Sequence, residues 1–184
     1  LIAPIAKVVQ GKVNTVIKVK GKLKSDLTPE INTISGDLFA SLIDSKVVTE
    51  ASPLLSALDS QFTGLNLSNL NLKDLKAAVD FEDGKVKIKP FTLKYKDVAI
   101  QVAGSHGFDQ QMNYKLLFNV PPQMLGKEAE NLLTKLTPEN QKKITNLPVV
   151  ATVGGTFKKP EVSTDIKTVV KDLATQIAKN QINN

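Results

Sequence analysis

The fold of this chain is decided by residues 70–120, which read LNLKDLKAAVDFEDGKVKIKPFTLKYKDVAIQVAGSHGFDQQMNYKLLFNV. Apolar side chains recur at every second position in five segments of this stretch, the period that puts alternate side chains on opposite faces of a strand. Turn sequences separate the segments. Asp83-Gly84 is the strongest of them, because a tight hairpin needs the positive φ that glycine adopts easily. The stretch therefore predicts an antiparallel meander with one apolar face and one lysine-rich face.

The alternation slips by one position near Pro90. The lysines within residues 85–89 occupy odd positions, whereas Lys94 and Lys96 occupy even positions. Such a slip turns the side chains to the opposite face unless a bulge absorbs it, and proline lacks the N–H of a regular ladder. We therefore expect an irregularity or a strand break at Pro90.

The sequence before this stretch predicts two more strands of the same sheet. Residues 13–23 form the first strand, with lysines on one face, and residues 31–42 form the second, interrupted at Gly36. Residues 1–10 look like the end of a helix closed by Gly11. The apolar face of the first strand carries Val13, Ile17, Val19 and Leu23.

Several amphipathic helices accompany the strands. A serine or threonine followed by proline, as at residues 52–53 and 137–138, is a typical helix start, and Gly64 is expected to end the first of these helices. Leucines at helical spacing over 125–136, and a stripe from about Asp165 onward, predict two more. The last helix packs on its own domain or, alternatively, lies on a membrane surface. The predicted fold class is α+β: a curved, mostly antiparallel meander with helices packed on it or capping it, forming a single domain over residues 1–184.

The composition narrows the class of partner. The net charge of +6 comes from basic residues that are all lysine, and arginine, tryptophan and cysteine are absent. Base readout uses the guanidinium fork and single-strand binding uses exposed aromatics, so nucleic acid is not an expected partner. The lysines form a solvated sheet face or a surface weakly attracted to anionic lipid. No apolar run is long enough for a transmembrane helix and no signal peptide opens the chain, which we expect to be a fragment of a longer protein.

Catalytic and metal-binding patterns are missing. The only histidine, His106, follows Ser105, but adjacent strand residues point to opposite faces and do not meet easily. The acidic pairs lie in a turn and on a helix surface, and no phosphate loop or calcium loop is present. We therefore expect no enzyme, no catalytic residues, no cofactor and no metal. An envelope hydrolase built on Ser105 and His106 is the weakest alternative.

Three segments resemble a known family. FEDGKVKIKPFTLKYKDVAIQVAG (residues 81–104) and FDQQMNYKLLFNVP (residues 108–121) are similar to the strands and hairpin of the C-terminal region of AsmA-like proteins. The closing LPVVATVGGTFKKPEVSTD (residues 147–165) resembles the ending of that region, although Gly154-Gly155 stands where one glycine would do. The resemblance covers residues 52–179 and rests on structural patterns, not on catalytic ones.

The resemblance implies a place in the envelope of Gram-negative bacteria. AsmA-like proteins are usually held in the inner membrane by an N-terminal helix, which would lie outside this fragment, and their β-rich part is periplasmic. They are linked to outer-membrane biogenesis, and their relatives resemble bridge-like lipid-transfer proteins with a hydrophobic β-sheet groove. The family supplies no catalytic residue to carry over.

Two main hypotheses follow. In the first, the apolar sheet face binds and transports phospholipid or another acyl lipid, or else is ordinary core beneath the helices. In the second, the domain is a protein-interaction or scaffold module for outer-membrane protein assembly, with a strand edge that adds a partner's strand. The candidate groove residues are Val79, Phe81, Val86, Ile88, Leu93, Tyr95, Ile100, Val102, Leu116 and Phe118.

Overall fold

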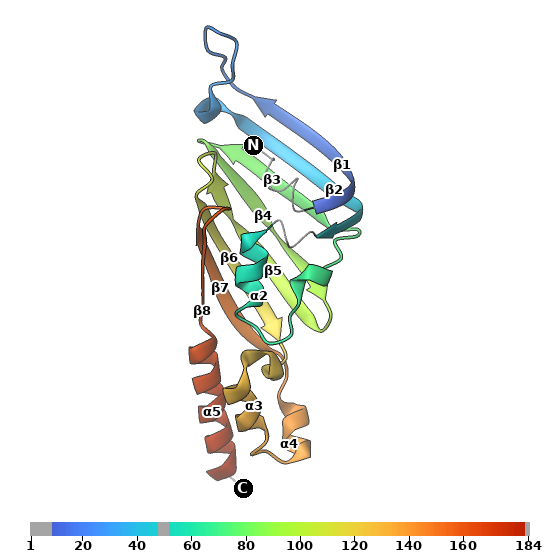
Figure 1. Cartoon of the computed structure of the whole chain (residues 1–184), viewed down its shortest axis with the longest axis vertical. Coiled ribbons are helices and arrows are strands. Elements are labelled where there is room, and N and C mark those ends of the chain that lie inside the picture. The colour runs from blue at the N-terminus through green and yellow to red at the C-terminus, as the bar shows by residue number, and fades with distance from the viewer. Residues whose placement is uncertain (1–8, 48–51, 183–184) are drawn as a thin grey trace.

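The chain folds around one open antiparallel sheet of eight strands. The structure is a computed structural model and describes residues 9–47 and 52–182. The strands lie side by side in the order in which they occur in the sequence, from β1 to β8, and each pairs only with its neighbours (Figure 1). The predicted α+β meander is confirmed.

The bounds of the elements are as follows. The strands are β1 (Val9–Lys20), β2 (Ser35–Val47), β3 (Lys76–Glu82), β4 (Lys85–Tyr95), β5 (Val98–Gly107), β6 (Met112–Val120), β7 (Leu147–Gly155) and β8 (Pro160–Thr164). The described helices are α2 (Pro53–Asp59), α3 (Lys127–Leu133), α4 (Pro138–Lys143) and α5 (Ile166–Ile182), with short 3₁₀ turns η1 (Ile31–Thr33), η3 (Leu67–Asn69) and η4 (Pro122–Leu125).

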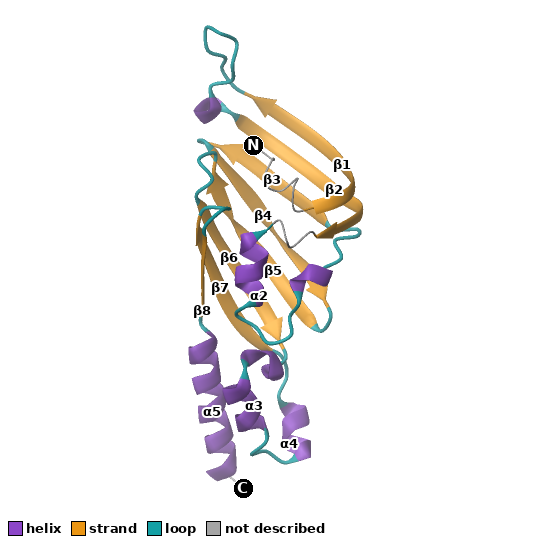
Figure 2. Ribbon diagram, viewed as in Figure 1, coloured by secondary structure: helices purple, strands orange, loops and turns teal. Residues whose placement is uncertain are grey.

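The helices occupy two places relative to the sheet. Helix α2 lies across one face of the sheet, whereas α3, α4 and α5 lie beyond the ends of the strands (Figure 2). Both helix starts predicted from a serine or threonine followed by proline are confirmed. The backbone N–H of Leu55 donates to the Ser52 side chain at 3.3 Å, and that of Asn140 donates to Thr137 at 3.4 Å. Local capping therefore starts these short helices where the sequence predicts.

Two glycines within strands allow close approach of the neighbouring strand. Gly36 has φ of +144° and Gly104 has φ of +139°. A Cβ at Gly36 would collide with the Lys18 carbonyl, and one at Gly104 with the Asn113 carbonyl. Glycine at such positions permits a tight bend in a sheet. The predicted interruption at Gly36 is wrong, because Gly36 is the second residue of β2 and pairs within the sheet.

The irregularity expected at Pro90 is confirmed. The register between β4 and β5 shifts between Ile88 and Phe91, while the strand itself continues without a break. The shift moves the apolar face of β4 from even positions to odd ones. Both halves of β4 consequently keep their apolar side chains on the same side of the sheet.

Several predicted boundaries are wrong. The second strand is Ser35–Val47 and not residues 31–42, because residues 31–33 form the 3₁₀ turn η1. The first strand is Val9–Lys20 and not residues 13–23, because the chain beyond Lys20 turns into a loop in which Leu23 bridges back to Pro29. Of the helix predicted over residues 1–10, residues 1–8 lie outside the described part, and the last two belong to β1. Strand β8 was not predicted at all.

Helix ends differ from the prediction for a local reason. Helix α2 ends at Asp59 and not at Gly64, because the N–H groups of Gln61 and Phe62 bond to carbonyls three residues back and form tight turns. Likewise, the helical stripe predicted over 125–136 is split, since Gly126 has φ of +94° and separates η4 from α3.

Candidate binding face of the sheet

The strand register collects the apolar side chains of the sheet on one face, here termed the inner face. It is the face that α2 covers. Because side chains alternate along a strand, directly facing residues share a face across the whole sheet. Two rows of facing residues illustrate it: Ile17, Leu38, Val79 and Ile88 across β1 to β4, and Leu93, Ile100, Phe118 and Val149 across β4 to β7.

All ten candidate groove residues lie on the inner face, so their common orientation is as predicted. Four of them are buried, and the other six are partly buried. The buried residues are Phe81, Val86, Ile100 and Phe118. The partly buried residues are Val79, Ile88, Leu93, Tyr95, Val102 and Leu116.

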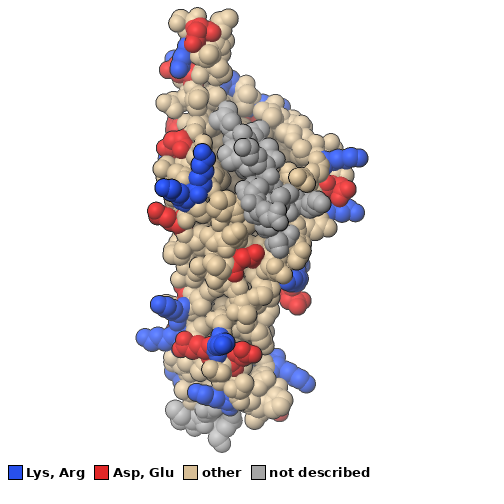
Figure 3. All heavy atoms as spheres, viewed as in Figure 1, with Lys and Arg blue, Asp and Glu red and all other residues tan. Residues whose placement is uncertain are grey.

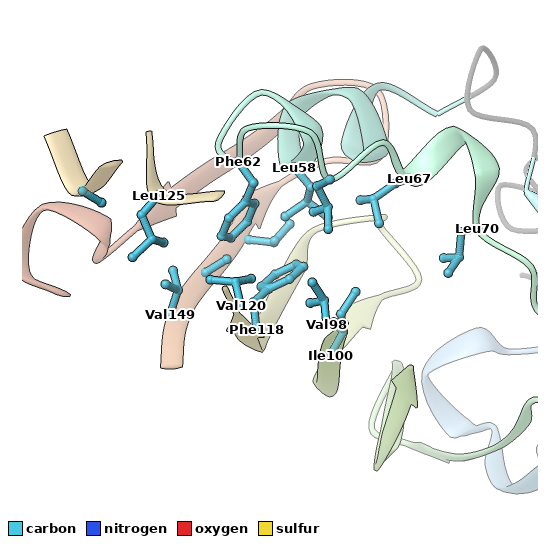
Figure 4. Close-up of a cluster of buried hydrophobic side chains, with 14 of the residues drawn as sticks. Leu58, Phe62, Leu67, Leu70, Val98, Ile100, Phe118, Val120, Leu125 and Val149 are labelled. Atoms are coloured by element: carbon cyan, nitrogen blue, oxygen red, sulfur yellow. The ribbon is translucent and has the colours of Figure 1, made fainter. Parts of the chain in front are cut away.

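The part of the inner face over β5 to β7 is filled by protein. Phe62, just after α2, stacks in a tilted arrangement on Phe118 with ring centroids 4.7 Å apart. Leu58 of α2 and Leu67 of η3 point at the same cluster (Figure 4). Ile100 is 3% exposed and Phe118 is 1% exposed. These two candidates therefore belong to a packed core, the alternative that the sequence left open for them.

The inner face becomes exposed toward β1. Val13, Ile17 and Val19 point to the inner face, and each keeps about half of its surface in solvent, with exposed fractions of 52%, 49% and 56%. Sequence reasoning put them on one face of a strand but left them out of the groove. The signal that could have included them is the alternation itself, which β1 shares with β3 to β6. The inner face thus runs from a filled core to an open apolar margin.

The opposite face, here termed the outer face, carries the lysines of the strands. Lys18 faces Asp37, which faces Asp80, which faces Lys87. The ion pair from Lys89 to Asp80 spans 3.2 Å and is solvent-exposed, so it contributes little to stability. On the side drawn in Figure 3, charged side chains project along the left and right margins and also form a band across the lower part of the molecule. The predicted division into an apolar and a lysine-rich face is confirmed.

His106 lies on the inner face near the end of β5 and is buried. Its Nδ1 shares a hydrogen bond of 2.7 Å with the Tyr114 hydroxyl, and the edge of its ring meets Phe157 at 5.1 Å between centroids. Burial lowers the pKa of His106 below 6.5 and raises the pKa of Tyr114 to about 12. Burial thus keeps both groups neutral near pH 7, which suits a structural contact between strands.

Ser105 and His106 do not form a nucleophile-base pair. Ser105 faces Asn113 on the outer face, whereas His106 faces Met112 on the inner face. A serine nucleophile needs its base within hydrogen-bond distance. An open hollow of about 400 Å³ next to these residues is lined largely by the turns at the strand ends.

Metal-binding clusters and membrane-spanning helices are both absent from the described part of the chain. Over residues 9–47 and 52–182, no three or more His, Asp or Glu side chains gather where they could hold a metal ion. Within the same residues, no helix combines the length and hydropathy needed to cross a membrane. The inner face therefore remains the candidate binding site in the described residues.

Comparison with known proteins adds no family. No protein-family model matches the chain, and neither the curated proteins nor the solved structures contain a match.

Proposed function

We propose that this chain is a non-enzymatic domain of the bacterial cell envelope that shelters the acyl chains of phospholipid on its inner face. The observation that carries the proposal is the continuity of that face. It extends from the packed core at Ile100 and Phe118 to half-exposed side chains on β1, with no charged residue among the facing positions of β1 to β4.

The driving force would be burial of methylene groups. Each buried CH₂ contributes about 0.8 kcal/mol. An extended acyl chain lying on β1 to β4 would cover Ile17 and Val79, while the exposed Lys22, two residues beyond the end of β1, would attract anionic headgroups. The resemblance of residues 52–179 to AsmA-like proteins supports a periplasmic setting, an inner-membrane anchor elsewhere in the protein, and a role in outer-membrane biogenesis.

The test compares lipid binding by two matched variants. Ile17→Asp puts a charge on the exposed inner face, and Val16→Asp puts the same charge on the outer face of the same strand. Both side chains are about half exposed, at 49% and 57%, so both variants should fold. Each protein is incubated with phospholipid vesicles and then examined by native mass spectrometry, with solvent extraction of anything bound.

We expect stoichiometric phospholipid on the wild-type protein and on Val16→Asp, and a strong loss on Ile17→Asp, because a carboxylate would have to be desolvated against acyl chains. Thermal melting by circular dichroism checks that both variants are folded. A wild-type protein that stays free of lipid, or equal binding by the two variants, would refute the proposal.

The scaffold hypothesis concerns a different part of the molecule. It needs a free strand edge, whereas lipid shelter needs an open face. The two hypotheses are therefore separable by experiment.

A further inference from the structure

The two edges of the sheet are built differently. The β8 edge is only five residues long, begins at Pro160 and leads directly into α5. Short length and proline are two ways in which proteins protect an edge from pairing. The β1 edge is twelve residues long, contains no proline, and has no strand paired on its far side among the described residues.

The β1 edge also lacks the inward-pointing charge that would block pairing. Its inner-face side chains include Val13, Thr15, Ile17 and Val19. None of these residues is charged and three of the four are apolar, so the inner face stays largely apolar up to the edge strand β1. An added strand with apolar side chains on the same face would cover them and continue the face.

The charge on β1 is one-sided. The strand carries Lys12, Lys18 and Lys20 on its outer face and no acidic residue. Asp44 lies across from Lys12, and Asp37 lies across from Lys18, both on the β2 side. Among the described residues, no strand lies on the other side of β1, so these lysines face no acidic residue there.

We propose that the β1 edge binds an extended segment of a separate polypeptide by strand addition, and that this segment is apolar on one face and acidic on the other. Lys12 and Lys18 are six residues apart on the regular strand of the β1–β2 pair. The incoming segment would therefore place two acidic residues six positions apart opposite them. Because side chains alternate, this spacing leaves the odd positions between for apolar residues toward the inner face.

A second copy of this chain fits the edge poorly. Antiparallel pairing of β1 with another β1 about Thr15 would set Lys12 against Lys18 on both sides of the centre. Like charges directly opposite each other destabilise a strand pair. The β8 edge of another copy has five residues and therefore cannot present two acids six positions apart.

The experiment uses the whole chain and synthetic peptides of about nine residues, a typical strand length. One peptide alternates valine with polar residues and carries two glutamates six positions apart. A second peptide replaces both glutamates by lysine. Binding is measured by fluorescence anisotropy, and backbone hydrogen exchange locates the site.

The protein variants test charge at the edge against charge elsewhere on the outer face. Lys12→Glu/Lys18→Glu reverses the charge on β1, whereas Lys94→Glu/Lys115→Glu makes the same change in net charge on exposed positions of β4 and β6. All four side chains are exposed, so neither pair of changes disturbs the core. The second variant is therefore a matched control.

We expect the glutamate peptide to bind wild-type protein and to protect the amides of β1 from exchange. The β1 variant should prefer the lysine peptide, with a change in relative affinity on the order of tenfold, while the control variant behaves as wild type. Equal binding of both peptides, protection outside β1, or no binding would overturn the proposal, and so would self-association through β1 in the absence of peptide. Because lipid is absent from this assay, its outcome is independent of lipid binding on the inner face.

Discussion

The contact between Phe62 and Phe118 is expected to hold the helical cover onto the sheet. Both rings are buried, at 5% and 1% exposed, and they lie 4.7 Å apart between centroids. Replacing a buried phenylalanine by alanine costs about 3 to 5 kcal/mol, because burial is lost and a cavity remains. Phe118→Ala should therefore lower the free energy of unfolding by about 4 kcal/mol and the midpoint temperature by about 10 °C.

The double variant separates the pair contact from general burial. Aromatic pairs contribute about 0.5 to 1.5 kcal/mol beyond their buried area, and the two alanine cavities would share the same space. Phe62→Ala/Phe118→Ala should therefore lose less stability than the sum of the single variants, by about 1 kcal/mol or more. Phe39→Ala is the matched control, because Phe39 is 43% exposed on the outer face of β2.

The assay is urea unfolding followed by far-UV circular dichroism, since the chain has no tryptophan to report by fluorescence. Phe39→Ala should cost about 1 kcal/mol or less, in line with a partly exposed side chain. Equal losses for Phe118→Ala and Phe39→Ala, or strict additivity in the double variant, would refute the assignment of this contact to the core.

Three further perturbations have defined signs. Gly104→Ala should lower the free energy of unfolding by about 2 to 3 kcal/mol in urea titration, because alanine is strained at φ of +139° and its Cβ would meet the backbone of β6; Gly64→Ala, with open space around it, should cost less. Because burial lowers the pKa of His106, its contribution to the free energy of unfolding is fully present above pH 6.5 and is lost as pH falls below that value. A His106→Gln variant should therefore lack the decrease in the free energy of unfolding that begins at pH 6.5 in the wild-type protein. Because burial raises the pKa of Tyr114 to about 12, the free energy of unfolding should fall as pH rises from 10 to about 12. Asp59→Ala should cost about 1 to 2 kcal/mol in thermal unfolding, because both carboxylate oxygens accept from the Leu67 N–H at 2.8 and 3.0 Å; a midpoint unchanged from wild type would contradict that role.

The features that the sequence predicts well are local. Three of them are confirmed: the alternation within each strand, the irregularity at Pro90, and the helix starts at Ser52-Pro53 and Thr137-Pro138. Each depends on a few neighbouring residues. The end of α2 was missed because two tight turns compete with the expected glycine stop at Gly64. Strand β8 was missed because its five residues follow a turn and carry too short an alternating pattern to stand out.

At the candidate site, the sequence could predict which face of the sheet each side chain points to, but not which of these side chains the rest of the chain buries. Parity correctly put Phe118 and Ile88 on the same face, yet Phe118 is buried against Phe62, just after α2, and Ile88 is only partly buried. The difference depends on where Phe62 docks, which is a contact between residues far apart in the sequence. No local pattern encodes such a contact, so the division of the inner face into core and open margin needed the structure.

The open margin is the strongest reason to expect a binding partner. Val13, Ile17 and Val19 each leave about half of their surface in solvent, so they contribute only part of the 1.5 to 3 kcal/mol that full burial of such a side chain provides, about 1 kcal/mol each. Threonine would keep the strand propensity of β1 at these positions without exposing apolar surface. A sheet that served only as a scaffold for its own core would gain little from the apolar choice. An acyl chain on the inner face and a strand on the β1 edge would each bury these side chains further, so both proposals account for the same exposed surface and differ in which side of β1 is approached.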